Sequence, residues 1–143
     1  MTSLVFPDIN VWLALSYNMH RHHHTALGWF AALGDDAMLV FCRHTQLGWF
    51  RLLTTEAVLS ADVRTQKECW ALFDQWIDSG RAILANDPAG LDDNFRSRAT
   101  VESPSPKVWA DAYLAAFAET GQLTLVTFDR ALAATVQGAM LLG

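Results

Sequence analysis

Three aspartates occupy positions from which their carboxylates could share one site. Asp8 directly follows the apolar run Leu4–Phe6, and Asp129 comes shortly after the apolar run Leu123–Val126. Asp111 lies in the first turns of an expected helix, beside an apolar stripe. Three carboxylates in one cleft repel one another, and a divalent cation would keep them all ionised. Carboxylate oxygens are ligands that Mg²⁺ or Mn²⁺ prefers, whereas the scarcity of His and absence of Cys in these stretches disfavour zinc.

Each aspartate also has a purely structural interpretation. Asp is a favoured N-cap residue, and both Asp8 and Asp129 precede an expected helix. Asp111 could lie at the solvent edge of its helix and pair with Lys107 one turn earlier. These roles explain each acid alone. The placement of all three at the starts of elements favours a shared site.

A parallel sheet would bring these acids together. Short apolar runs alternate with helical patterns along the chain, as in α/β proteins. We expect a three-layer α/β/α fold with a four- or five-stranded, mainly parallel sheet. The expected strands are Leu4–Phe6, Met38–Phe41, Ala82–Leu84, Leu123–Val126 and Ala139–Leu142. Functional groups in such sheets gather beyond the carboxyl ends of the strands, which is where Asp8 and Asp129 fall.

Helical periodicity and capping residues place the helices between these strands. Ser105 and Pro106 are expected as the N-cap and first residue of the helix that carries Asp111. The other expected helices begin near Asp8, cover residues 22–33, 45–54, 65–79 and 91–100, and follow Asp129. Residues 60–62 are expected to form a loop. Because no linker or repeat interrupts the pattern, residues 1–143 are expected to form one domain.

The bulk composition limits the classes of function. The formal net charge is −5 and the pI is about 5.4, so the basic signature of many nucleic-acid-binding proteins is missing. A nucleic-acid substrate would then depend on bound cations for positive charge. Cys42 and Cys69 lack metal-binding spacings and are expected to be buried thiols in a reducing compartment. With no signal-like start and no apolar run near roughly 20 residues, a cytoplasmic protein that does not enter membranes is expected.

Four stretches of the chain resemble, in order and spacing, the motifs of PIN-domain ribonucleases of the VapC type. Residues 6–15, 41–54, 109–118 and 126–130 read FPDINVWLAL, FCRHTQLGWFRLLT, WADAYLAAFA and VTFDR. VapC proteins are the toxins of bacterial type II toxin–antitoxin pairs. The resemblance implies a PIN fold, Mg²⁺- or Mn²⁺-dependent endoribonuclease activity, a cognate antitoxin protein and usually a homodimer.

The resemblance also implies roles for particular residues. Asp8, Asp111 and Asp129 match the acidic metal ligands of the family. Asn10 matches the polar residue of the first motif, and Thr127 matches the Ser or Thr two positions before the last acid. Asn10 and Thr127 would orient carboxylates or waters around the ion.

One position departs from the family pattern. The family commonly has a Glu on the helix after the second strand, and this chain has Gln46 there. A Gln oxygen can bind Mg²⁺ or hold a water but carries no charge, so the site would hold three formal charges, which makes one-metal catalysis feasible. Glu56 is a candidate substitute, although it falls beyond the expected helix.

The implied reaction is hydrolysis of an RNA phosphodiester by a metal-activated water, which leaves 5′-phosphate and 3′-hydroxyl ends. RNA phosphates would need cationic partners outside the metal site. The candidates are Arg43, Arg51, Arg96, Arg98 and Arg130, although an ordinary surface or structural charge is the favoured interpretation of any one of them.

Two other functions fit parts of this pattern. A haloacid-dehalogenase-type phosphatase would use Asp8 as a nucleophile, but it needs a second acid at position 10 and a catalytic Lys, of which the chain has only Lys67 and Lys107. A catalytically weakened PIN-like RNA- or protein-binding module would follow if Gln46 disables the site.

Two further clusters have ordinary structural interpretations. The histidines at 20, 22, 23 and 24 could bind a transition metal or contact RNA or a partner. We favour a third interpretation, in which they start a helix with their rings in solvent. The amphipathic helix with Trp70, Phe73 and Trp76 is expected to pack in the core, with a dimer or antitoxin surface as the alternative.

Overall fold

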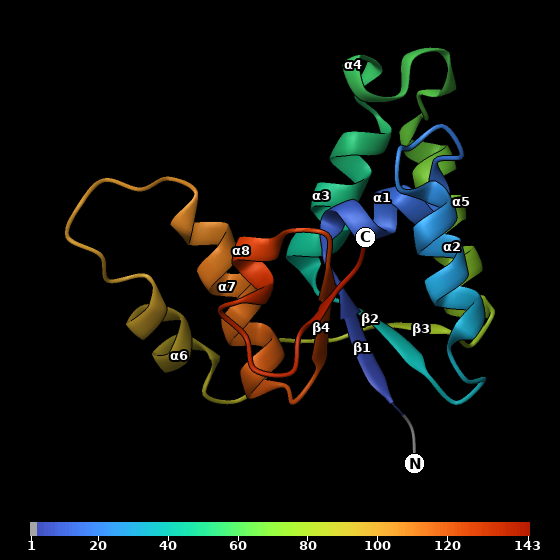
Figure 1. The fold of residues 1–143 in the computed structure, drawn as a ribbon. Coiled ribbons are helices and arrows are strands. Elements are labelled where there is room, and N and C mark those ends of the chain that lie inside the picture. The colour runs from blue at the N-terminus through green and yellow to red at the C-terminus, as the bar shows by residue number, and fades with distance from the viewer. Residues whose placement is uncertain (1–2) are drawn as a thin grey trace.

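Five strands form one sheet in the computed structural model, which describes residues 3–143 (Figure 1). They are β1 (Leu4–Pro7), β2 (Met38–Phe41), β3 (Ala82–Leu84), β4 (Thr124–Thr127) and β5 (Met140–Leu141). Their order is β3-β2-β1-β4-β5, and every neighbouring pair is parallel. The expected α/β class is therefore confirmed. Residues 1 and 2, part of the expected domain, lie outside the described residues.

Helices cover both faces of the sheet and give the expected three layers. The first face carries α1 (Ile9–Ser16), α2 (His23–Ala32), α3 (Arg43–Leu53) and α5 (Gln66–Asp78). The second face carries α6 (Leu91–Arg98), α7 (Val108–Thr120) and α8 (Arg130–Ala133). Between α3 and α5, the short helix α4 (Glu56–Leu59) and the 3-10 turn η1 (Ser60–Asp62) replace the expected loop. No helix within residues 3–143 is long and apolar enough to cross a membrane.

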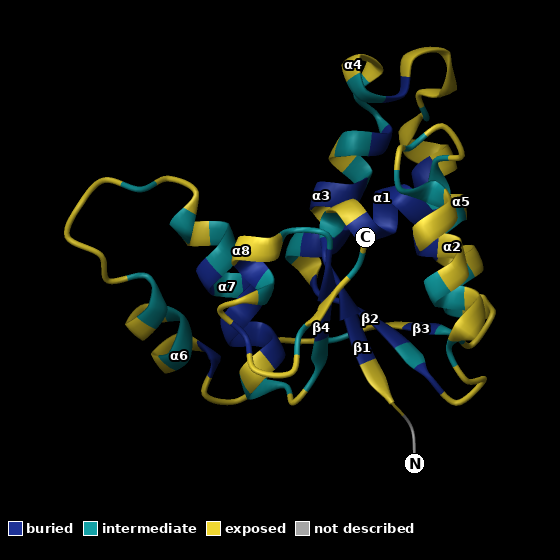
Figure 2. Cartoon of the chain, in the orientation of Figure 1, coloured by how far each residue is buried: buried dark blue, intermediate teal, exposed yellow. Residues whose placement is uncertain are grey.

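The central strands contribute to both cores because successive side chains point to opposite faces of a strand. Val5 packs in the core under α1, α2, α3 and α5, whereas its neighbour Phe6 packs in the core under α7. Val126 and Leu125 of β4 divide in the same way. Figure 2 shows this part of β1 and β4 as buried. Burial on both faces explains why these strands are uninterrupted apolar runs in the sequence.

Aromatic side chains dominate the core of the first face. Trp12 is fully buried, and its ring stacks on Phe41 with the ring centroids 3.8 Å apart. Trp76 meets the Trp12 ring edge-on, with the ring centroids 5.2 Å apart, and the Trp49 ring lies tilted to it at 5.9 Å. Truncating so large a buried side chain to Ala typically costs about 3–5 kcal/mol. Phe73 and Trp76 thus pack inward as expected, whereas Trp70 is half exposed.

The expected start of the helix that carries Asp111 is wrong. α7 begins at Val108, because the Ser105 hydroxyl donates to the Ser103 carbonyl at 3.3 Å and does not cap the helix. The chain instead turns through Pro106, with the Val108 N–H donating to the Ser105 carbonyl at 3.0 Å. Lys107 takes the N-cap position without a capping side-chain hydrogen bond. The helix therefore starts without the side-chain support that the sequence led us to expect.

Candidate active site

The pairing of β1 with β4 sets Asp8 and Asp129 beside each other. Pro7 lies opposite Val126 in the parallel register, and the Asp8 N–H donates to the Val126 carbonyl at 2.9 Å. Parallel strands end at the same edge of a sheet, so the residues that follow them emerge together. Two acids far apart in the sequence are thereby brought to one edge by backbone pairing alone.

Thr127 joins these two acids directly. Its hydroxyl donates to Asp8 Oδ2 at 2.9 Å and accepts from the Asp129 N–H at 3.0 Å. The Thr127 side chain is fully buried, so both hydrogen bonds lie in a low-dielectric setting where they are strong. A single hydroxyl thus fixes the Asp8 carboxylate relative to the backbone of Asp129.

Both acids also cap the helices that follow them. Asp8 Oδ1 accepts from the Ile9 N–H at 2.6 Å, at the start of α1. Asp129 Oδ1 accepts from the N–H groups of Ala131 and Leu132 at 2.9 Å and 3.2 Å, at the start of α8. A negative charge is favoured at a helix N-terminus. The capping interpretation and the shared-site interpretation therefore hold together for these two residues.

Asp111 approaches the pair from α7, on the second face of the sheet. Burial raises the pKa of Asp8; hydrogen bonds from Thr127 and Ile9 oppose this, and the charges of Asp129 and Asp111 raise the pKa further. Burial raises the pKa of Asp111 as well, the Lys107 ammonium lowers it, and Asp129 raises it. The three carboxylates therefore lie within electrostatic reach of one another. The ion pair that Lys107 makes is with Asp129, at 3.9 Å, and not the expected one with Asp111.

The carboxylate oxygens of Asp8, Asp111 and Asp129 are ligands of the type that a hard divalent cation prefers, but they do not form a complete metal-binding site. Among residues 3–143, no three or more His, Cys, Asp or Glu side chains gather closely enough to hold a metal ion. Asp8 is nonetheless a buried carboxylate, 8% exposed, with two further carboxylates acting on it. Like charges around a buried acid favour a cation as their partner, and all-oxygen donors favour Mg²⁺ or Mn²⁺ over zinc. Asp8, Asp111 and Asp129 are the predicted ligands by the type of their donor atoms, but the structure does not bring the three carboxylates together as one ligand set.

Gln46 is buried on α3, with 1% of its surface exposed. Its Oε1 accepts from Arg43 Nη1 at 2.5 Å, while its buried Nε2 finds no hydrogen-bond partner among the described residues. Glu56, the candidate substitute, is exposed and begins the separate helix α4 at the far end of α3 (Figure 1). Asn10 is exposed, and its side chain makes no hydrogen bond within residues 3–143. In the structure, hydrogen bonds therefore connect Asp8, Thr127 and Asp129, and Asn10 is not part of this hydrogen-bonded group.

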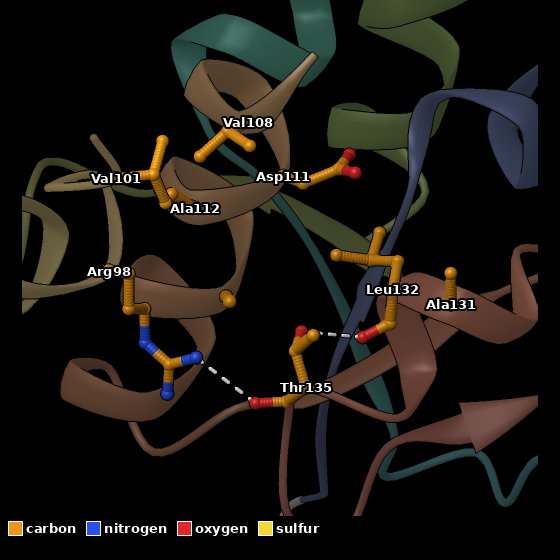
Figure 3. Close-up of a pocket in the computed structure, with 9 residues that line it drawn as sticks. Arg98, Val101, Val108, Asp111, Ala112, Ala131, Leu132 and Thr135 are labelled. Atoms are coloured by element: carbon orange, nitrogen blue, oxygen red, sulfur yellow. Dashed lines mark hydrogen bonds between the residues drawn. The ribbon is translucent and has the colours of Figure 1, made fainter. Parts of the chain in front are cut away.

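Two pockets are lined in part by α7, the helix that carries Asp111. One, of about 340 Å³, lies between α6, α7 and α8, with the Asp111 carboxylate pointing away from Arg98 (Figure 3). In this pocket Arg98 donates to the Thr135 carbonyl at 3.0 Å and pairs with Glu119, so it is engaged within the fold. The other pocket, of about 290 Å³, lies between α1, α3 and α7 and includes His44 and Arg51.

Sequence reasoning missed His44. Burial lowers the pKa of its ring, the charge of Asp8 opposes this, and Arg51 lowers the pKa further. Its Nε2 is buried without a hydrogen-bond partner in the described part of the chain. In the sequence His44 directly precedes the expected helix 45–54, and no periodicity shows which neighbour it meets; in the structure it belongs to α3.

The other arginines and the histidine cluster are largely engaged in the fold. Arg96 pairs with Asp92 at 3.1 Å on the surface of α6, whereas Arg51 and Arg130 are exposed. The expectation that the clustered histidine rings lie in solvent is wrong for two of them. The His22 ring stacks on Phe128 at 4.3 Å, and His23 Nδ1 lies 2.6 Å from the Ala14 carbonyl oxygen. Phe128 is distant from His22 in sequence and Ala14 lies on the preceding helix from His23, so the local pattern did not reveal these contacts.

Both cysteines are buried, as expected. Cys42 and Cys69 are free and buried, and burial raises the pKa of both thiols. Cys42 also caps α3, where its Sγ accepts from the Thr45 N–H at 3.4 Å. A buried thiol with a raised pKa is a poor nucleophile, which fits a structural role.

The chain is similar to proteins of one family. No family model matches it. It is 44% identical over 132 residues to ribonuclease VapC41 of Mycobacterium tuberculosis, and the match covers 90% of each chain. Its fold is similar to that of VapC20, a sarcin–ricin loop cleaving toxin of the same organism, with a TM-score of 0.62, 18% identity and coverage of 92% of this chain and 94% of VapC20. It is also similar to FitAcB from Neisseria gonorrhoeae, with a TM-score of 0.53, 21% identity and 96% coverage of both chains. Because the chain is 44% identical to ribonuclease VapC41 over 90% of both sequences, it belongs to the VapC family of PIN-domain ribonucleases.

Proposed function

We propose that this protein is a Mg²⁺- or Mn²⁺-dependent endoribonuclease toxin that hydrolyses RNA phosphodiesters. The observation that carries the proposal is the arrangement of Asp8 and Asp129 around the Thr127 hydroxyl, with Asp111 within electrostatic reach of both. Membership of the VapC family, through ribonuclease VapC41, supports RNA as the substrate.

The protein side chains have distinct parts in this proposal. Asp8, Asp111 and Asp129 would hold the divalent ion, which when bound lowers the pKa of a coordinated water and offsets charge on phosphoryl oxygens. Thr127 fixes the orientation of the Asp8 carboxylate through its hydrogen bond. Gln46, held by Arg43, contributes no negative charge, so the acidic group keeps three formal charges.

The chemistry of the products follows from the nucleophile. The oxygen of water forms the new bond to phosphorus, the bond to the 3′-oxygen breaks, and the leaving oxygen takes up a proton. The products are a 5′-phosphate and a 3′-hydroxyl. The RNA 2′-hydroxyl takes no part, so a 2′,3′-cyclic phosphate would contradict the proposal.

The proposal extends to partners. As a VapC-type toxin the protein would act in the cytoplasm, be inhibited by a cognate antitoxin protein and form a homodimer. Exposed apolar side chains such as Trp70 and Trp109, which are 50% and 61% exposed, offer surface for such contacts.

The test uses purified protein and a structured RNA. Wild-type protein should cleave the RNA in Mg²⁺ or Mn²⁺, EDTA should stop cleavage, and Asp8→Asn should abolish it. Asp74→Asn is the matched control, because Asp74 is exposed on α5 on the first face of the sheet. Toxicity on expression, relieved by Asp111→Asn, would be a cheaper first observation. Intact RNA in all metals would overturn the proposal.

A second candidate is a PIN-like RNA- or protein-binding module without cleavage. The neutral Gln46, with its Oε1 occupied by Arg43, favours it. The same assay separates the two functions, because a binding module would retain the RNA uncut in every metal tested.

A further inference from the structure

The helix α7, which carries Asp111, is held unevenly along its length. Its second half is deeply buried, and residues 114–118 are no more than 2% exposed. At its far end, Glu119 pairs with Arg98 of α6. The first turn has no such support, because α7 begins without a side-chain cap and Trp109 is exposed. Asp111 therefore lies on the less firmly held part of the helix.

One side chain ties this part of α7 to another element. The Tyr113 hydroxyl donates to Asp87 Oδ1 at 3.0 Å. A tyrosine hydroxyl is protonated at neutral pH and an exposed carboxylate is ionised, so this hydrogen bond is charge-assisted. Asp87 makes no other side-chain hydrogen bond and no ion pair within residues 3–143. The carboxylate therefore has no partner in the fold that competes with Tyr113.

Asp87 is itself firmly placed at the carboxyl edge of the sheet, shortly after β3. The Ala85 N–H donates to the Phe41 carbonyl at 2.8 Å, so pairing with β2 continues past the end of β3. Pro88 follows Asp87 directly and restricts the backbone on its other side. Because the strands are parallel, this edge is also the one that carries the acids after β1 and β4. The hydrogen bond of Tyr113 therefore fastens α7 to the edge of the sheet where the predicted ligands lie.

The ring of Tyr113 is held by three other rings. His44 of α3, Phe95 of α6 and Phe117 of α7 lie with their ring centroids 5.7, 5.8 and 5.9 Å from it. The first two meet the ring edge-on, a favourable arrangement for aromatic pairs. Packing against two neighbouring helices therefore fixes the direction in which the hydroxyl points.

This contact controls the rotation of α7 about its own axis. Residues two positions apart on an α-helix point in nearly opposite directions, because each turn holds about 3.6 residues. With Tyr113 directed to α3, α6 and Asp87, Asp111 lies on the opposite side of α7. There it lines a pocket together with Ala131 and Leu132 of α8 (Figure 3). A rotation of α7 that broke the Tyr113 hydrogen bond would therefore move the Asp111 carboxylate as well.

We propose that Tyr113 is a positioning residue for Asp111: its hydrogen bond to Asp87 fixes the rotation of α7 and thereby the place of the Asp111 carboxylate relative to the acids at the strand edge. The inference rests on the proposed metal-dependent function, in which Asp111 is a predicted ligand. It makes the position of that ligand depend on the end of β3, a strand that carries none of the predicted ligands.

The binding test measures the Mn²⁺ affinity of the full chain by calorimetry, without RNA. Tyr113→Phe removes only the hydroxyl and should weaken Mn²⁺ binding roughly three- to tenfold, as expected for the loss of one hydrogen bond. Asp87→Ala should have the same effect, and the double variant should be no weaker than either alone, because both changes remove one shared bond. Asp87→Asn keeps an acceptor oxygen and should bind nearly as wild type does.

Matched controls come from the same residue types. Tyr17→Phe changes the other tyrosine of the chain, whose hydroxyl makes no hydrogen bond within the described residues. Asp93→Ala removes an exposed carboxylate on α6. Both variants should bind Mn²⁺ as wild type does.

A second background separates positioning from a general loss of stability. In Asp111→Asn, the side chain that Tyr113 is proposed to position has lost its charge, so adding Tyr113→Phe should leave Mn²⁺ affinity unchanged, as measured by electron paramagnetic resonance of the free ion. A merely structural role would weaken binding in both backgrounds. Hydrogen exchange in EDTA is the metal-free readout. The amides of residues 112–115 should exchange faster in Tyr113→Phe than in wild type or Tyr17→Phe.

The outcomes separate the inference from the function it rests on. If wild-type protein binds Mn²⁺ and cleaves RNA while Tyr113→Phe and Asp87→Ala keep wild-type affinity, Tyr113 does not position Asp111 and the inference is wrong. If Tyr113→Phe weakens binding equally in the wild-type and Asp111→Asn backgrounds, its role is structural and the inference is again wrong. If wild-type protein neither binds Mn²⁺ nor cleaves RNA, the proposed function fails, and the inference fails with it.

Discussion

The strand edge that carries Asp8 and Asp129 and the helix end that carries Asp111 are built differently. At the strand edge, backbone pairing between β1 and β4 and the buried Thr127 hydroxyl fix both acids. At the helix end, α7 begins without a side-chain cap after the exposed segment 101–104, and Trp109 is 61% exposed. Two of the acids are therefore positioned by the topology of the sheet, whereas the position of the third depends on the packing of one helix.

The largest difference should come from lengthening each acid by one methylene. Asp8→Glu forces a longer side chain into a site where both carboxylate oxygens already accept hydrogen bonds. We expect RNA cleavage to fall more than about 100-fold and stability to fall by about 1–3 kcal/mol. Asp111→Glu, on the less constrained support, should lose only about tenfold in cleavage and little stability. Initial cleavage rates and urea denaturation measure the two effects. Equal losses in both variants would show that the two regions are equally rigid.

A smaller effect should follow removal of the hydroxyl that joins Asp8 to Asp129. Thr127→Val keeps the shape of the side chain but leaves Asp8 Oδ2 and the Asp129 N–H without their partner. Loss of such a supporting hydrogen bond typically costs 10–100-fold in metal affinity or activity, and we expect about that loss in Mn²⁺ affinity by calorimetry. Thr124→Val, at the start of the same strand, is the control and should bind Mn²⁺ as wild type does. Wild-type affinity in Thr127→Val would mean that backbone pairing alone positions the acids.

In metal-free protein, the pH dependence of stability should reveal the raised pKa of Asp8 at the strand edge. Because folding raises the pKa of Asp8, mainly by burial, its protonated form is favoured in the folded state. This contribution to stability is fully present below the ordinary Asp pKa and is lost as the pH rises through the raised pKa. Urea denaturation in EDTA between about pH 4 and 8 should therefore show stability falling with rising pH, and Asp8→Asn should flatten that fall. If the free energy of unfolding falls with pH as steeply in Asp8→Asn as in the reference variant Asp74→Asn, groups other than Asp8 cause the pH dependence.

The smallest effect should come from the cation at the helix end. The ammonium of Lys107 lowers the pKa of Asp111 and lies 3.9 Å from Asp129, but Lys107 is largely exposed. In Lys107→Gln the pKa of Asp111 should rise, as measured by carboxyl ¹³C titration, while stability changes by less than about 1 kcal/mol because exposed ion pairs contribute little. Lys67→Gln, on α5, should leave the Asp111 titration unchanged. A falling Asp111 pKa in Lys107→Gln would contradict the electrostatic assignment.

The strands and the class of fold could be predicted because their signals are local. Buried runs such as Leu123–Val126 fix the strands, and the rule for parallel sheets then sets Asp8 and Asp129 at one edge. Local signals failed where a side chain had a competing partner. Ser105 looked like an N-cap, but its hydroxyl turns back to Ser103. His22 looked solvated, but it stacks on Phe128, more than a hundred residues away.

The site was only partly accessible from sequence. A match to motif residues predicted roles for Asn10 and Thr127 alike, yet only Thr127 contacts an acid in the structure. The burial of His44 was missed because it depends on the packing of α3 against Tyr113 of α7, which no single stretch of sequence encodes. Metal binding by the three aspartates stays a prediction.

The hydrogen bond between Thr127 and Asp8 spans 119 positions of the chain. During synthesis the N-terminal strand β1 is made long before β4, its neighbour in the finished sheet. A nascent chain therefore has no assembled centre until almost all of its residues have been translated. For a protein proposed to cut the RNA of the cell that makes it, this order of synthesis delays assembly of the acidic site until the chain is nearly complete.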